Sequence, residues 1–69
     1  MEMYSINRSD KLRACRVDRG LSRKDLAAAA NIKINRYDRA EGGLLMGWFN
    51  ADEIFRLSKV LDIDLSVLT

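Results

Sequence analysis

Proline is absent from this chain of 69 residues, and glycine occurs at only four positions. The β-branched residues are sparse, and nowhere do they alternate over the length of a strand. The glycines are Gly20, Gly42, Gly43 and Gly47. This pattern favours an all-helical fold in which glycine punctuates the helices.

Side chains that can cap helix N-termini show where the helices begin. Ser22 is followed three residues later by Asp25, and Asn50 is followed at the same spacing by Glu53. Both arrangements are typical of a capping box, in which a side chain accepts a hydrogen bond from a free amide of the first turn. They predict that two helices begin at Ser22 and Asn50.

Four further positions indicate where the other helices begin or end. Ser9 and Asp64 can each cap a helix, Gly20 can take a left-handed stop, and Asn31 tolerates the positive φ of a tight turn. The sequence therefore predicts one domain over residues 1–69, a bundle of five helices preceded by an irregular arm over residues 1–8. The predicted helices span about 9–19, 22–30, 33–41, 50–61 and a last turn at 64–68.

The size of the chain and its residue types restrict its chemistry. A chain this small buries only about 60% of the surface that its unfolded form exposes, so it usually needs a disulfide, a metal or a partner. The single cysteine, Cys15, cannot form an internal disulfide, and without histidine a zinc site has almost no ligands. We therefore expect a homodimer with no metal and no cofactor. An enzyme is not expected, because Cys15 maps to the buried face of the first helix and no phosphate-binding glycine pattern occurs.

No targeting or membrane segment is recognisable. No apolar run approaches the roughly 18 residues that cross a bilayer, and the N-terminus lacks the order of a secretory signal. We expect a cytoplasmic protein that does not bind membranes.

The charge is unevenly distributed along the chain. Residues 1–40 hold ten Lys and Arg against five Asp and Glu, a net charge of +5, whereas residues 41–69 hold two against five, a net charge of −3. A basic front and an acidic back suit a protein that meets a polyanion on one side, although a solvated charged surface would look the same.

The second and third predicted helices carry a family resemblance. Gly20-Leu21-Ser22 opens the second helix, Leu26-Ala27 lies within it, and Glu41-Gly42 closes the third. In this order, and with an ending similar to the family's last two helices, about residues 10–69 resemble the phage repressor and Cro-type helix-turn-helix family. The resemblance implies a lambda-repressor-like domain that places its third helix in the major groove of double-stranded DNA.

The resemblance also implies roles for individual residues. It places Ile34, Asn35 and Arg39 at base-reading positions, with Lys33 at the start of the helix, although Ile34 could instead be a core residue. The resemblance also implies phosphate contacts and a structural ion pair. The alternative for these residues is that they lie on a solvated helix face. The phosphate contacts are Ser22, Arg23 and Arg36, and the ion pair joins Arg16 to Glu41.

The segment after the third helix departs from the family. It is longer than usual, and five of its nine residues are large and apolar where the family has polar or basic ones. In one interpretation Trp48, Phe49 and one leucine fill the core beside the small Ala40, and in the other the loop forms a contact surface for a second copy or another protein. Both can hold together, because a nine-residue loop does not readily bury five large side chains at once. The five are Leu44, Leu45, Met46, Trp48 and Phe49.

Two functions remain open from the sequence. The first is a dimeric, Cro- or repressor-like transcription regulator of a bacterium or phage that binds a two-fold operator. The second is an inhibitor or antitoxin-like module that keeps the fold but binds a protein partner through the apolar loop, because fold alone does not fix function.

Overall fold

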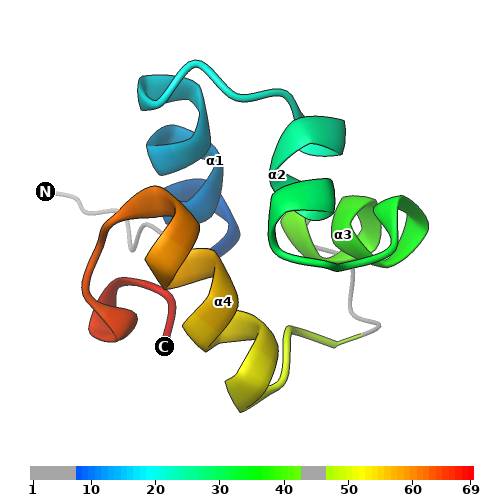
Figure 1. The fold of residues 1–69 in the computed structure, drawn as a ribbon. Coiled ribbons are helices and arrows are strands. Elements are labelled where there is room, and N and C mark those ends of the chain that lie inside the picture. Colours follow the sequence, from blue (N-terminus) through cyan, green and yellow to red (C-terminus); the bar gives the residue numbers. More distant parts are fainter. Residues whose placement is uncertain (1–7, 43–46) are drawn as a thin grey trace, which may run out of the picture.

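The helices of the computed structural model pack around one small core (Figure 1). The structure describes residues 8–42 and 47–69. Within them lie four α-helices and a short 3-10 helix, η1, instead of the five helices that the sequence predicts, because the last turn is too short to form an α-helix. The elements are α1 (Arg8–Asp18), α2 (Arg23–Ala29), α3 (Ile34–Glu41), α4 (Ala51–Leu61) and η1 (Leu65–Val67).

Three of the predicted caps are present. The Ser22 side chain accepts a hydrogen bond from the Asp25 amide at the start of α2, and Asp64 accepts one from the Ser66 amide at the start of η1. Asn50 and Glu53 form a complete capping box at the start of α4. The cap predicted at Ser9 is wrong, because α1 begins one residue earlier and Ser9 lies buried inside it.

The turn between α2 and α3 has the predicted conformation. Asn31 adopts a left-handed φ of 56°, and the Ile32 amide donates to the carbonyl of Ala27 over 2.8 Å. This tight turn sets α3 across α2 and sends the side chain of Ile32 into the core. Gly20, with a φ of 71°, makes the left-handed stop after α1.

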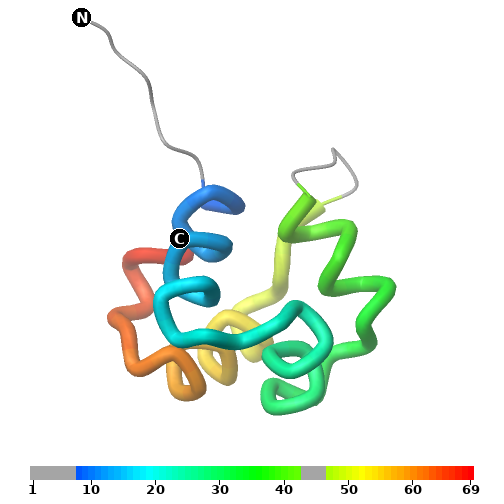
Figure 2. Tube along the Cα trace, turned by 90° about the horizontal axis from the view of Figure 1, so that it is seen from above, coloured from blue at the N-terminus to red at the C-terminus, as the bar shows by residue number. Residues whose placement is uncertain are grey.

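The core is apolar and lies where all the helices meet. Leu12 from α1, Leu26 from α2 and Tyr37 from α3 are fully buried, as are Leu57 and Leu61 from α4. The C-terminal segment closes the core by lying beside α1, as Figure 2 shows, with Leu68 also fully buried.

Two arginine side chains donate hydrogen bonds to carbonyls at the ends of other helices. The Nε of Arg56 in α4 donates to the carbonyl of Ala30, at the end of α2, over 2.7 Å. The Nε of Arg19 donates to the carbonyl of Leu61, at the end of α4, over 2.8 Å. Carbonyls at a helix C-terminus lack partners within the helix, so a guanidinium that satisfies them fixes one helix against another.

No helix in the described part of the chain is both long and apolar enough to cross a membrane.

Candidate nucleic-acid interface

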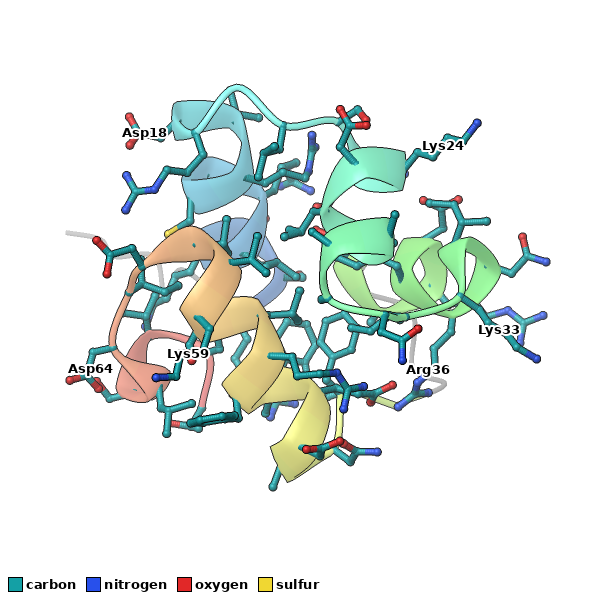
Figure 3. The ribbon with its side chains drawn as sticks, in the orientation of Figure 1. Asp18, Lys24, Lys33, Arg36, Lys59 and Asp64 are labelled. Carbon is teal, nitrogen blue, oxygen red and sulfur yellow. The ribbon has the colours of Figure 1, made fainter. Side chains whose placement is uncertain are left out.

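The outward face of α3 carries polar, basic and apolar side chains together (Figure 3). Asn35 and Arg39 are exposed and four residues apart, so both lie on one side of the helix. Ile34 is 39% exposed, and three other large apolar side chains of the described residues are more exposed than it is. Ile34 therefore does not belong to the core, and its base-reading role stays a prediction.

A pocket runs along this face of α3. Its lining is polar and basic, with three cations and one exposed apolar side chain, and therefore attracts a polyanion that also offers hydrogen-bonding edges. The lining residues are Lys33, Ile34, Asn35, Arg36, Arg39, Ala40 and Gly47.

The opposite face of α3 is buried. Tyr37 is fully buried and its ring lies 5.8 Å from that of Phe49, so these two aromatic rings pack together in the core to which Ala40 also belongs. Sequence reasoning missed Tyr37. The available signal was its position four residues before Glu41, which places both side chains on one face of the helix.

The carboxylate of Glu41 contacts three side chains inside the domain. Its side chain is fully buried and accepts hydrogen bonds from Arg16 Nε over 2.7 Å, from Arg16 Nη2 over 3.2 Å and from the Tyr37 hydroxyl over 2.6 Å. Arg23 Nε lies 2.7 Å from Oε2 of the same carboxylate. Arg16 and Glu41 thus lie against each other, as the sequence predicts, but Arg23 and Tyr37 extend the pair to a network that joins α1, α2 and α3.

The pKa values of the network follow from this geometry. Burial by itself would raise the pKa of Glu41, but the hydrogen bonds from Arg16 and Tyr37 and the nearby cations outweigh it and lower that pKa. Burial and the hydrogen bond to Glu41 raise the pKa of Tyr37. Glu41 is therefore ionised and Tyr37 neutral at neutral pH.

Arg23 has partners within the fold that the sequence did not predict. Besides Glu41, its Nη1 lies 3.5 Å from Asp38. Arg36 is turned to α4, and the side chain of Arg23 reaches Asp38 from α2. Arg23 therefore neutralises the carboxylate that would otherwise repel phosphate next to the outward face of α3.

Arg36 also has a partner within the fold. Its Nε donates to Glu53 Oε2 over 2.6 Å and its Nη2 to Glu53 Oε1 over 2.5 Å. The bidentate pair connects α3 to α4, and Nη2 also reaches the carbonyl of Trp48 over 3.4 Å. Arg36 therefore pairs with an acid of the fold while its side chain remains 47% exposed.

The remaining basic side chains near α3 have no such partner. Lys24, Lys33 and Arg39 are exposed, and none of them forms an ion pair with a residue that the structure describes. In Figure 3, Lys24 and Lys33 project from the side of the molecule formed by α2 and α3, whereas Asp18 and Asp64 lie on the opposite side. Lys59 lies on the same side as Asp64 in Figure 3, so cations are not confined to the side of α2 and α3.

The two aromatic residues of the apolar loop turn into the fold. Phe49 is 5% exposed, and the Trp48 indole donates to the carbonyl of Leu68 over 2.9 Å, with Arg8 stacked 4.8 Å from the ring centre. Phe49 therefore lies in the core and Trp48 is half-buried against it, which agrees with the core-filling role that the sequence offers for these two residues. Leu44, Leu45 and Met46 lie outside the described residues, so a contact surface on this loop stays a prediction.

Comparison with known proteins agrees with this architecture. A family model described as helix-turn-helix matches residues 12–68, most of the chain. The chain belongs to the XRE/Cro-type helix-turn-helix family, whose members are DNA-binding regulators and typically not enzymes. No curated protein matches the sequence.

Across residues 8–42 and 47–69, no cluster of acidic residues and cysteine is able to hold a metal ion.

Proposed function

We propose that this chain is a sequence-specific transcription regulator of the Cro or repressor kind that binds double-stranded DNA as a homodimer. The observation that carries the proposal is the outward face of α3. An exposed Ile34 lies there beside Asn35 and Arg39, on the second helix of a helix-turn-helix. In this motif the second helix enters the major groove.

Each of these side chains suits a different base edge. Arg39 can donate two hydrogen bonds to O6 and N7 of guanine, and Asn35 can pair with N6 and N7 of adenine. Ile34 offers only apolar contact, which suits the methyl group of thymine. Lys33, at the start of α3, can donate to a guanine or to the adjoining phosphate.

The phosphate contacts are assigned to groups that the fold leaves available. The Ser22 hydroxyl oxygen accepts from the Asp25 amide over 3.0 Å, and its own proton remains free to donate to a phosphate. Lys24 is exposed two residues further on and replaces Arg23 in this role, because Arg23 is bound to Glu41 and Asp38.

Dimerisation is proposed on two grounds. A domain of this size gains stability from a partner, and two copies of α3 about 34 Å apart would read half-sites one turn of DNA apart. A contact through the apolar loop would depend on Leu44, Leu45 and Met46, since Trp48 and Phe49 serve the fold.

Selection of duplexes from random-sequence DNA, followed by titration of the enriched duplex at several salt concentrations, tests the proposal. We expect a two-fold symmetric enriched sequence and a logarithm of affinity that falls with the logarithm of salt by about 0.9 for each phosphate contacted. Sedimentation of the complex should give two protein chains for each duplex. No enriched sequence, together with an affinity insensitive to salt, would contradict the proposal.

A further inference from the structure

Arg36 is on the helix proposed to read DNA, yet its guanidinium is engaged elsewhere. It lines the same pocket as Lys33 and Arg39, and in Figure 3 it lies on the same side of the molecule as Lys33. Lys33 and Arg39 have no ion pair with a described residue, whereas Arg36 holds both oxygens of Glu53. One of the three cations of this surface is therefore neutralised by the protein itself.

Glu53 is a fixed partner. Its side chain is 9% exposed, and it also accepts from the Asn50 amide over 2.9 Å as part of the capping box of α4. If Arg36 moved to a phosphate, a nearly buried carboxylate would lose its hydrogen-bonded cation and keep only the charge of Arg56 nearby, which is unfavourable. The bidentate geometry adds to this preference, because paired hydrogen bonds between guanidinium and carboxylate are among the strongest.

We propose that Glu53 withholds Arg36 from DNA and thereby acts as a specificity-determining positioning residue. The inference rests on the proposed function. A phosphate contact attracts every DNA sequence equally, so an occupied Arg36 keeps sequence-independent binding weak. A larger share of the affinity then depends on the base contacts of Ile34, Asn35 and Arg39.

The variant Glu53→Gln isolates the charge of this residue. Glutamine is accepted at the same position of a capping box, so the N-terminus of α4 keeps its cap while Arg36 loses its anionic partner. On a short duplex of random sequence, the magnitude of the salt slope should increase by about 0.9, the value of one added phosphate contact. The loss of affinity between about 50 and 200 mM salt should therefore grow by a further factor of about 3.5.

Asp52→Asn is the matched control. Asp52 is the adjacent residue in the same first turn of α4, and it pairs with Arg56, not with Arg36. The control removes the same charge at nearly the same place, so it separates release of Arg36 from a general change in net charge. We expect the salt slope of Asp52→Asn to equal that of the unmodified chain, with circular dichroism confirming that each variant is folded.

Arg36→Gln is a second test that does not depend on the folding of Glu53→Gln, and by itself it should leave the salt slope of the unmodified chain unchanged. Where Glu53→Gln folds, adding Arg36→Gln to it should abolish the gain that Glu53→Gln produces. A slope lowered by about 0.9 in Arg36→Gln would show that Arg36 already contacts phosphate and would overturn the inference. An equal slope in Glu53→Gln and Asp52→Asn would overturn it as well. Absence of DNA binding by the unmodified chain would instead overturn the proposed function, and the inference with it.

Discussion

The inner and outer faces of α3 differ in how many contacts each side chain makes with the rest of the domain. On the inner face, Glu41 is held by Arg16, Arg23 and Tyr37, and the Tyr37 ring packs against Phe49. On the outer face, Asn35 and Arg39 are exposed and form no ion pair with a described residue. The inner face therefore stabilises the fold. Residues of the outer face can be substituted, which would change the DNA sequence that is bound, at little cost in stability.

Glu41→Gln on the inner face should lower the free energy of unfolding by the largest amount. Because Glu41 is fully buried and the side chain of Arg16 is only 12% exposed, losing the carboxylate leaves a nearly buried guanidinium without its counter-charge. Breaking a buried pair in this way costs about 3–5 kcal/mol, comparable to the whole stability of a small domain. Urea denaturation measures the loss.

Asp38→Asn is the control for that substitution. Asp38 also pairs with Arg23, but both side chains are 45% exposed, so the expected loss is below about 1 kcal/mol. Equal losses in the two variants would show that the buried network does not stabilise the domain more than a surface pair.

Acid should destabilise the domain by protonating two paired carboxylates, Glu41 on the inner face of α3 and Glu53 on α4. The pKa of Glu41 is lowered by its hydrogen bonds despite its burial, and the hydrogen bonds from Arg36 lower the pKa of Glu53. A carboxylate with a lowered pKa in the folded state contributes stability that is present above its ordinary value of 4.5 and is lost as the pH falls through the folded value. The free energy of unfolding should therefore decrease as the pH is lowered below about 4.5, and less steeply in a folded variant that lacks one of these carboxylates. A stability that does not change with acid would contradict the assignment.

Arg39→Ala should affect binding while sparing the fold. Loss of a bidentate contact to guanine costs about 1–3 kcal/mol of binding free energy and relaxes the preference at one base pair. Stability should change little, because Arg39 is exposed. Lys59→Ala is a control on α4, where Lys59 stacks 5.1 Å from the ring of Phe55, and it should leave affinity and base preference unchanged. If both variants bind alike, Arg39 is not a base-reading residue.

The helices could be predicted from the sequence because their signals are local. Ser22, Asn31 and Asn50 act on backbone groups within a few residues, so each can be interpreted without knowledge of the rest of the fold. Ser9 misled the prediction because a serine that can cap can equally lie inside a helix. The family pattern placed Arg16 against Glu41, although their separation in the sequence carries no local signal.

The partners of the other arginines could not be predicted for a physical reason. Arg23 and Arg36 are long, flexible cations, and the choice between a phosphate and a carboxylate depends on which acid the packing brings near. Glu53 comes within reach of Arg36 only once α4 is packed against the rest of the domain, 17 residues further along the chain. Likewise, the inward positions of Trp48 and Phe49 depend on contacts with Leu68 and Tyr37, which form only in the folded chain.

A titration followed by nuclear magnetic resonance tests the central claim most directly. The isotope-labelled protein would be mixed with the duplex enriched by selection, and the shift of every backbone amide recorded. We predict the largest changes at Lys33, Ile34, Asn35 and Arg39, smaller ones at Ser22 and Lys24, and none beyond the experimental error at the buried end of α4. Changes centred on α4 and η1, with the amides of α3 unmoved, would contradict the assignment of the outer face of α3 as the DNA-reading surface.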